Sequence, residues 1–414
     1  MESLVHALGD PQHAFPVIHV TGTNGKGSTA RMITRLLLGQ GLVVGTYTSP
    51  HLERYNERIR VADVDCTDDE FASAIAAVQR VEPLLSDPPS HFEILTAAAF
   101  VHFADVAVDV AVIEVGLLGR YDATNVCDGA VAVVTNIGRD HTDFQGDWRA
   151  RIAREKAGVI KPSSHLILGE TDPSLREIFL GENPAAIWER DKDFGCGANR
   201  LAVGGRVLDL RTPLQSITDM YVPLHGAHQG DNAAVALAAA DAFFGRPTDP
   251  EIVREAFASV QMPGRFEVLG RDPLVILDGA HNPDGAEAAG RVLAEGFDVA
   301  GSRTLVVGML NDRDAEAMLR GLGVTDFDRV ICCTPPTSRA LPAAELALSA
   351  SSAGIAVVAE VIPSAADALG AAFARSGVGD LIMVTGSLYL VGEARGLLRT
   401  RKRRPAAVRP LPSQ

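Results

Sequence analysis

One lysine stands in a glycine-rich loop near the start of the chain, within VIHVTGTNGKGST at residues 17–29. Buried-strand residues precede this glycine loop (residues 22–27), and an amphipathic helix pattern follows it. Such a junction directs backbone N–H groups and a helix N-terminus at one point, which makes an anion site. Lys26 adds a cation suited to β- and γ-phosphates, and Ser28 or Thr29 could reach magnesium. These residue types indicate a nucleoside triphosphate site.

Two other interpretations of the glycine loop remain beside this one. The match to G-x-x-x-x-G-K-[ST] is imperfect, because Val20 replaces the first glycine and Gly27 separates Lys26 from Ser28, so the loop could be a glycine-rich turn with an incidental lysine. The spacing also resembles dinucleotide-binding loops, which need an acid at the end of the next strand. That strand ends in GTYTSPH without an acid, and none of the five tyrosines has lysine four places on. We therefore favour a triphosphate.

Polar residues follow three further strand-like runs. Ser49 follows GTYT, Glu114 ends VAVIE, and Asp140 and His141 follow VAVVTNIG. Ligands of open α/β sheets gather at the carboxyl ends of the strands. A hydroxyl, a carboxylate and an imidazole converging on a triphosphate make a plausible Mg²⁺ set, because Mg²⁺ combines few protein ligands with phosphate oxygens and water.

The elements that position these residues follow an α/β pattern. Strand-like runs near residues 17–22, 42–48, 106–116, 131–138 and 165–170 are continuously apolar, as in parallel strands covered on both faces. Helical patterns separate them, and a short β-rich patch and an alanine-rich helix at 226–244 follow. We expect a doubly wound, P-loop ATPase-like N-terminal domain.

A second, smaller α/β series begins after Pro/Gly-rich residues 263–273. Its strand-like runs lie near residues 274–282, 303–310, 328–335, 355–362 and 381–387. We place an ATP-binding domain at 1–268, a Rossmann-like C-terminal domain at 269–398 and a basic, disordered tail at 399–414.

Composition excludes several classes of protein. The net charge of −14 argues against nucleic acid as the main partner. No apolar run approaches the ~18 residues of a membrane span, and the N-terminus has no secretion-signal pattern. The five cysteines are scattered, which is typical of reduced thiols. We expect a cytoplasmic monomer that acts on small molecules, with no nucleic-acid or membrane partner.

Several motifs together resemble the folylpolyglutamate synthase/dihydrofolate synthase family of the Mur ligase superfamily. They are GTNGKGS, YTSPHL, HFEILTAAAF, VIEVGLLGRYDATN, DHTDFQG, REKAG, MPGRFE, DGAHNPDG and TGSLYL, in this order from about residue 8 to 398. The resemblance implies ATP-dependent ligation: ATP phosphorylates a folate or dihydropteroate carboxylate, and the amine of L-glutamate attacks the acyl phosphate.

The resemblance also assigns roles to individual residues. Those implied to hold ATP are Asn24, Gly25, Lys26, Gly27, Ser28, Asn232, Arg265 and Asp278. Ser49, Glu114, His141 and a carbamylated Lys156 are implied to hold two Mg²⁺ ions, and Lys26, Glu114, His141 and Lys156 to be catalytic. His281 and Ser387 are candidates for glutamate contacts, and Phe92, Arg120 and Asp122 for the pterin side.

One residue departs from the family pattern. Leu118 stands where relatives commonly have glycine in GLGGR, so we expect a reshaped loop near Glu114. Two functional alternatives remain, a nucleotide-binding regulator that has lost ligation and a Mur-type ligase acting on a cell-wall peptide. A regulator has no need of Lys156, Arg265 and Asp278.

Overall fold

The computed structural model describes residues 1–139, 146–354 and 359–403, with the backbone alone for 401–403. The chain divides into two compact units, Met1–Met262 and Pro263–Gln414. The expected boundary at residue 268 lies a few residues later than this division. The difference arises because β12 (Glu267–Arg271) pairs with β13 (Leu274–Asp278) in the second unit.

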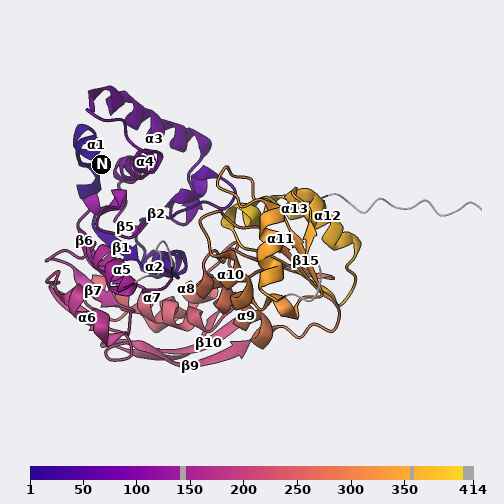
Figure 1. Cartoon of the computed structure of the whole chain (residues 1–414). Coiled ribbons are helices and arrows are strands. Elements are labelled where there is room, and N and C mark those ends of the chain that lie inside the picture. The colour runs from indigo at the N-terminus through magenta and orange to yellow at the C-terminus, as the bar shows by residue number, and fades with distance from the viewer. Residues whose placement is uncertain (140–145, 355–358, 404–414) are drawn as a thin grey trace, which may run out of the picture. The chain divides into compact units, whose positions relative to one another are not determined.

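An eight-stranded sheet forms the centre of the first unit (Figure 1), in the order β4-β3-β2-β5-β1-β6-β7-β8. The strands from β2 to β8 in this order pair in parallel, and β3 and β4 add an antiparallel edge. The chain first adds β2 and β5 on one side of β1 and then β6, β7 and β8 on the other, so the carboxyl end of β1 is a topological switch point, where ligands bind. The strands are β1 (Val17–Thr21), β2 (Val44–Tyr47), β3 (Ile59–Val61), β4 (Val64–Asp65), β5 (Val110–Glu114), β6 (Gly129–Val134), β7 (His165–Leu168) and β8 (Ala186–Glu189).

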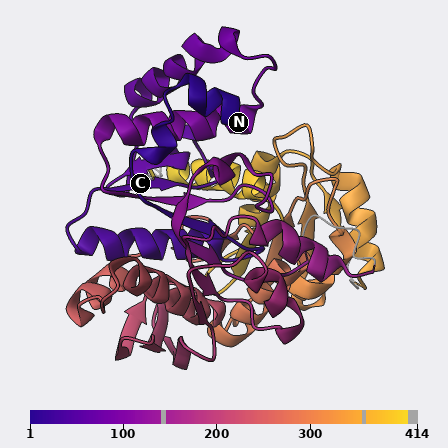
Figure 2. The same ribbon diagram turned by 90° about the vertical axis from the view of Figure 1, so that its left-hand side faces the viewer.

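Helices cover both faces of this sheet, since its strands are apolar on both faces. Along β1, Ile18 and Val20 join the core under α2, whereas Val17 joins the core on the other face. Figure 2 shows α2 on one side of the sheet and α3 and α4 on the other. The helices are α1 (Glu2–Ala7), α2 (Lys26–Gly39), α3 (Asp68–Val81), α4 (His91–Val106), α5 (Trp148–Ala157), α6 (Pro173–Leu180), α7 (His228–Phe244) and α8 (Pro250–Ala258).

A separate antiparallel sheet packs against α7. It comprises β9 (Gly195–Ala202), β10 (Gly205–Arg211) and β11 (Ser216–Val222), in the order β11-β10-β9. Its buried side chains, such as Leu208 and Met220, join the core that α2 and α7 share. This sheet is the β-rich patch expected from the sequence.

The second unit has its own six-stranded sheet, in the order β12-β13-β17-β14-β15-β16. All pairs are parallel except that between β12 and β13. The fold class expected from the sequence, two α/β domains, is confirmed. The remaining elements are α9 (Pro283–Gly296), β14 (Arg303–Val307), α10 (Ala315–Leu322), β15 (Arg329–Cys332), α11 (Ala343–Ser352), β16 (Glu360–Val361), α12 (Ala365–Ala374), β17 (Leu381–Thr385) and α13 (Leu388–Arg403), with 3₁₀ turns at Pro11–His13, Tyr55–Arg58, Glu82–Leu84, Ala123–Val126 and Val324–Asp326.

The last helix extends into the segment expected to be a tail. α13 continues to Arg403, so residues 399–403 are helical. Leu398 is buried in the same helix, and basic side chains are favourable near a helix C-terminus. Over the described ranges, no helix is long and apolar enough to span a membrane. The five cysteines are all free thiols.

Candidate active site

The glycine loop joins β1 to α2 at the switch point of the sheet. Gly25 precedes the first helical residue with φ of 83°, in the left-handed region that glycine adopts without strain. A Cβ at Gly25 would also collide with the side-chain oxygen of Asn232 from α7. The first N–H groups of α2 have no partner within the helix and carry the positive end of its dipole. The loop therefore presents an anion site.

Two lysine side chains meet at one carbonyl of this loop. Lys26 Nζ donates to Gly22 O at 2.9 Å and to Thr23 O at 3.1 Å. Lys156, from the last turn of α5, donates its Nζ to the same Gly22 O at 2.8 Å. The two nitrogens are therefore no farther apart than the sum of their distances to that oxygen. Lys156 is only 4% exposed, so it does not lie on a solvated helix face.

Glu114 places a buried carboxylate beside the start of α2. In the β1–β5 register it pairs with Val20, just before the glycine loop. Both carboxylate oxygens lie 3.7 Å from the position a Cβ would take on Gly27. Glu114 Oε2 accepts a hydrogen bond from Ser49 N at 3.0 Å, at the end of the neighbouring β2. The structure thus brings Ser49 and Glu114 together next to the glycine loop.

This pair suits a divalent ion that also binds phosphate. A carboxylate and a hydroxyl are hard oxygen ligands, and Mg²⁺ takes most of its remaining ligands from phosphate and water. Within residues 1–139, 146–354 and 359–403 there is no group of three or more His, Cys, Asp or Glu side chains that could hold a metal. The expected ligand His141 and its neighbour Asp140 lie outside the described residues.

Asn232 and Ser28 both lie close to the end of the glycine loop. Asn232 is buried and donates its Nδ2 to Gln229 Oε1 at 3.0 Å, which orients its Oδ1 beside Gly25. Ser28 is buried in the first turn of α2. Both are therefore held near the start of that helix.

The loop after β5, residues 115–122, connects Glu114 to the backbone around Lys156. Leu118 has φ of 60°, a left-handed conformation uncommon for leucine. Its carbonyl accepts from Thr21 Oγ1 at 2.7 Å. A Cβ at Gly119 would lie 2.8 Å from Glu155 O and 3.1 Å from Lys156 Cα. The loop therefore packs directly on the last turn of α5.

Phe92 borders the same loop from α4. Its ring occupies the space that a Cβ on Gly116 would need, and its centroid lies 6.1 Å from that of Tyr47. An apolar aromatic face thus adjoins the residues that follow Glu114. That Phe92 lines the pterin side stays a prediction.

The side chains of Asp122 and Arg120 both make hydrogen bonds to other residues of the protein. Asp122 Oδ2 accepts from Leu117 N at 2.8 Å, and its Oδ1 accepts from Thr124 N at 3.0 Å. Arg120 pairs with Glu182 and donates to Arg154 O at 3.2 Å. In this structure these two side chains shape and anchor the loop, and their contact with a substrate stays a prediction.

In the second unit, Asp278 ends β13 and organises the turn that follows. Its Oδ1 accepts from Ala280 N and its Oδ2 from Phe266 N, each at 2.9 Å. Burial raises the pKa of Asp278, and the Arg265 charge opposes that shift. Arg265 Nη1 donates to Gly279 O at 3.1 Å.

His281 and Ser387 lie at the same edge of the second sheet. His281 Nδ1 is 2.9 Å from Gly279 O, so this nitrogen carries the proton. Ser387 follows β17, the parallel neighbour of β13, and its buried hydroxyl accepts from Tyr389 N at 3.2 Å. The second unit thus gathers four of the expected residues at one edge.

Two residues that the sequence analysis did not single out, Thr135 and Asn136, contact the glycine loop. Asn136 bonds to Asn24 through both its side-chain oxygen and its side-chain nitrogen. The available signal was their position, since polar residues directly after a buried strand share the edge where the glycine loop lies. For Lys156 the signal was its spacing from Ile152 and Ala153, which places it on the apolar face of α5.

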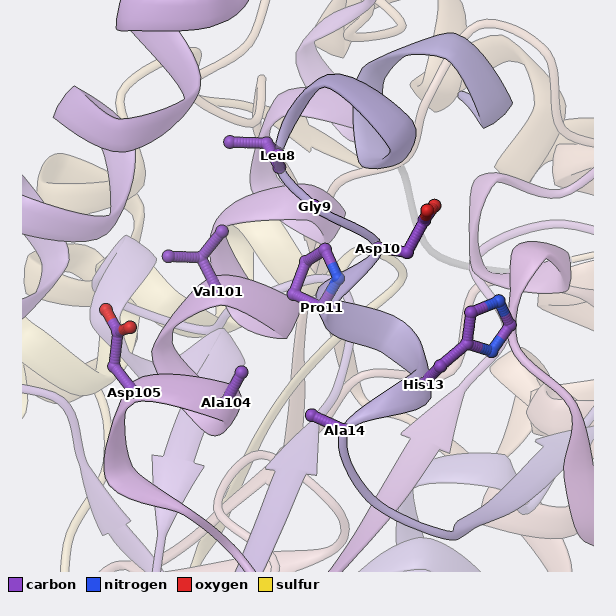
Figure 3. Close-up of a pocket in the computed structure, with 9 residues that line it drawn as sticks. All are labelled: Leu8, Gly9, Asp10, Pro11, His13, Ala14, Val101, Ala104 and Asp105. Carbon is purple, nitrogen blue, oxygen red and sulfur yellow. The ribbon is translucent and has the colours of Figure 1, made fainter.

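A hollow of about 520 Å³ lies elsewhere in the first unit (Figure 3). Residues between Leu8 and Ala14, together with Val101, Ala104 and Asp105 of α4, line it. These first residues precede β1, so the hollow lies toward the amino end of the strand whose carboxyl end carries the glycine loop. It is separate from the candidate site.

Comparison with known proteins accounts for nearly the whole chain. Family models match as "Mur ligase middle domain" over residues 20–240 and "Mur ligase, glutamate ligase domain" over residues 264–388. The Mycobacterium tuberculosis dihydrofolate synthase/folylpolyglutamate synthase is 38% identical over 443 residues, covering 96% of this chain and 89% of that protein.

Two solved structures extend this similarity. The Mycobacterium tuberculosis folylpolyglutamate synthase complexed with ADP and AMPPCP superposes with a TM-score of 0.92 at 37% identity, covering 98% of this chain and 95% of the other. A bifunctional folylpolyglutamate synthase/dihydrofolate synthase with Mn, AMPPNP and L-glutamate bound has a TM-score of 0.86 at 31% identity, covering 96% and 93%.

Proposed function

Because the chain belongs to the dihydrofolate synthase/folylpolyglutamate synthase family of Mur ligases, it is an ATP-dependent ligase that joins glutamate to a folate, and we propose that the glycine loop, Glu114 and Lys156 carry out this ligation. The observation that supports this assignment best is the meeting of Lys26 and Lys156 at Gly22 O, beside the Glu114 carboxylate and the first turn of α2.

In the proposed reaction, a substrate carboxylate oxygen attacks the γ-phosphorus of ATP, and ADP leaves. The amine of L-glutamate then attacks the resulting acyl phosphate, so that an amide forms and phosphate leaves. Lys26 and the N–H groups at the start of α2 offset the negative charge of the transferring phosphoryl group. Lys26 reaches the phosphates by exchanging its bonds to Gly22 O and Thr23 O for phosphate oxygens.

Ser49 and Glu114 would hold Mg²⁺, together with His141 and a carbamylated Lys156, and we infer two ions. The solved relative with Mn and AMPPNP bound supports a divalent ion in this family. When bound, Mg²⁺ orients the phosphates and neutralises charge on them. Glu114 would supply a carboxylate ligand. The hydrogen bond from Ser49 N and the burial of the side chain hold this carboxylate in place.

Carbamylation of Lys156 is supported by the position of its amine. The reaction joins the neutral amine to CO₂ and releases a proton, and both burial and a neighbouring cation favour the neutral form of an amine in general. Lys156 is buried, and its Nζ shares an acceptor with Lys26. The carbamate would replace the bond to Gly22 O by an anionic oxygen ligand. ¹³C-labelled bicarbonate and NMR would detect it directly.

The other assignments follow the family and their places in the structure. Asn24, Gly25, Gly27, Ser28 and Asn232 surround the start of α2, as ATP contacts should. We propose that Arg265 and Asp278 contribute to ATP binding, and that His281 and Ser387 contact L-glutamate. We place the pterin near Phe92, with Arg120 and Asp122 shaping that side.

Measuring ADP release separates the candidate substrates. Dihydropteroate, tetrahydrofolate and a UDP-muramyl substrate would each be supplied with ATP, Mg²⁺ and L-glutamate. We expect turnover with one or both pterins and none with the muramyl compound. Turnover of the muramyl compound would instead identify a cell-wall ligase. ATP binding without turnover on any of the three would favour a nucleotide-binding regulator.

We also propose that the protein works in the cytoplasm as a monomer on small molecules. The net charge of −14 disfavours a nucleic-acid partner. Sedimentation of the purified chain, with and without ATP, would test the monomer, because a dimer would double the measured mass.

A further inference from the structure

The glycine loop needs support from outside to keep one shape. Gly22 and Gly25 have φ of 147° and 83°, and glycine loses more conformational freedom on ordering than any other residue. A site made of backbone N–H groups binds well only when those groups are held in position before the ligand arrives. The end of β6 supplies that support.

Asn136 holds the backbone of Asn24 through both polar atoms of its side chain. Asn136 Oδ1 accepts from Asn24 N at 3.0 Å, and Asn136 Nδ2 donates to Asn24 O at 3.0 Å. Its own carbonyl accepts from Thr23 N at 2.9 Å. A side-chain amide offers a donor and an acceptor side by side, as a peptide group does. Asn136 therefore continues the β1–β6 pairing beyond Thr21 into the glycine loop.

Thr135 supports the same peptide. Its hydroxyl donates to Asn24 O at 2.6 Å, so this carbonyl accepts two hydrogen bonds from the end of β6. The hydroxyl also fills the space beside Gly22 where a side chain would lie. Gly138 N donates to Thr23 Oγ1 at 3.0 Å and secures the preceding residue.

We propose that Asn136 is a positioning residue for the ATP phosphates, assisted by Thr135, although neither contacts the nucleotide. Asn136 accepts hydrogen bonds from the backbone N–H groups of Thr23 and Asn24, so these two groups are not available to the phosphates. The phosphates therefore accept hydrogen bonds from the N–H groups of residues 25–28, at the start of α2. Removing the Asn136 amide lets the loop adopt other shapes, which weakens phosphate binding. The inference rests on the proposed function only in that the glycine loop binds ATP.

Calorimetric titration of the full-length protein with AMPPCP and Mg²⁺ tests this role. Asn136→Ala removes both side-chain bonds and should weaken AMPPCP binding about 10- to 100-fold. Asn136→Asp keeps the acceptor but sets an oxygen against Asn24 O, so it should weaken binding as much. Thr135→Val removes one bond at nearly constant shape and should weaken binding about 3- to 10-fold.

Two controls separate positioning from general damage. AMP lacks the β- and γ-phosphates, so its affinity should stay within about 2-fold in every variant if only the phosphate loop is disturbed. Thr304→Val is the matched control for Thr135→Val, because Thr304 is buried in β14 and its hydroxyl has no partner among the described residues. It should bind AMPPCP like the wild type.

In steady-state assays with the pterin that turns over, the KM for ATP should rise in the Asn136 and Thr135 variants while the KM for glutamate stays constant. Wild-type AMPPCP affinity in Asn136→Ala or Thr135→Val would overturn the proposal. Equal losses for AMP and AMPPCP would also overturn it, since they indicate general damage. A wild-type protein that binds AMPPCP but ligates no pterin would refute the proposed function and leave this inference standing.

Discussion

The carboxyl ends of β1 and β13 begin from the same architecture and use their polar groups differently. At β1, charged side chains from separate elements converge: Lys26 and Lys156 meet at Gly22 O, and Glu114 lies beside the start of α2. At β13, Asp278 and Arg265 bond mainly to backbone groups of their own turn.

This difference indicates a division of labour between the two units. The first unit holds charge in place before any ligand arrives, which is what stabilisation of a transferring phosphoryl group requires. In the second unit, the carboxylate of Asp278 and the guanidinium of Arg265 bond to nearby backbone groups. We therefore expect substitutions at β1 to affect the chemical step, and the four tests below are ordered by expected size.

Lys26→Ala should have the largest effect. Loss of the ammonium removes the charge that faces the phosphates, and we expect turnover to fall by about 10³-fold or more. The free energy of unfolding should fall by only about 1–3 kcal/mol, because the loss is limited to two hydrogen bonds to loop carbonyls. Steady-state kinetics and urea unfolding measure the two quantities.

Lys161→Ala is the matched control. Lys161 also donates to a backbone carbonyl, that of Asn125 at 3.3 Å, but lies outside the site. It should keep nearly full activity. Activity close to wild type in Lys26→Ala would show that the glycine loop does not bind the phosphates as proposed.

Lys156→Ala should remove ligation while leaving ATP binding largely intact. If the carbamate holds a metal, acetate or formate should enter the vacated space and restore part of the activity, whereas neither should rescue Lys26→Ala. Removing a buried side chain should also lower the free energy of unfolding by about 1–3 kcal/mol. Two results together would contradict the carbamate assignment: an active Lys156→Ala enzyme, and an unmodified Lys156 in a nucleotide-bound crystal of the wild-type protein.

Buried groups in the two units should make opposite contributions to stability in mild acid. In the first unit, burial lowers the pKa of His19 to about 3 from 6.5, so its contribution to stability is complete above pH 6.5 and falls as pH decreases toward 3. In the second unit, burial raises the pKa values of Asp278 and Glu393, so their contributions increase as pH falls through those raised values.

Unit-specific probes can measure this contrast. Both tryptophans, Trp148 and Trp188, belong to the first unit, so their fluorescence follows its unfolding in urea. Between pH 6.5 and 4.5 we expect its free energy of unfolding to fall by at most about 1.4 kcal/mol per pH unit from His19. His19→Asn should flatten this slope. Hydrogen exchange should show no such loss in the second unit.

Leu118→Gly should have the smallest effect. Glycine relieves the left-handed strain, about 1 kcal/mol, but gives up the packing of a half-buried leucine, so stability should change little. Because residue 118 lies between Glu114 and the Phe92 side, the KM for the pterin should change by a few-fold and more than the KM for ATP. Equal changes in both constants would remove the basis for this prediction.

The sequence was informative where one local pattern determines a structure. The glycine loop, its flanking strand and helix, and the strand-end position of Glu114 all follow from short-range pattern and turn chemistry. Ser49 and Glu114 could be expected at neighbouring strand ends, and the structure joins them through one hydrogen bond. Parallel topology explains this success, because it brings the carboxyl ends of all strands to one edge.

Tertiary contacts were beyond such reasoning. The neighbours of Lys156, Arg154 and Glu155, suggest a solvated face, whereas its spacing from Ile152 and Ala153 indicates the apolar face of α5. Neither pattern predicts that its amine bonds to Gly22 O, 134 residues away in sequence. Many polar residues follow a strand, so the position of Asn136 alone does not reveal its role. That role depends on its hydrogen bonds to Asn24, 112 residues away in sequence. The left-handed Leu118 could be suspected only from the family pattern, since leucine has no intrinsic preference for that conformation.

The central place of β1 in its sheet has a consequence for the order of folding. β1 is made early, but its partners β5 and β6 come much later, and the bond from Asn24 to Asn136 spans 112 residues. Closing so long a loop is entropically costly, and such contacts form late. A nascent chain that has not yet reached β6 would therefore possess the glycine loop in sequence but not in shape, and nucleotide could assist folding only after β6 has docked.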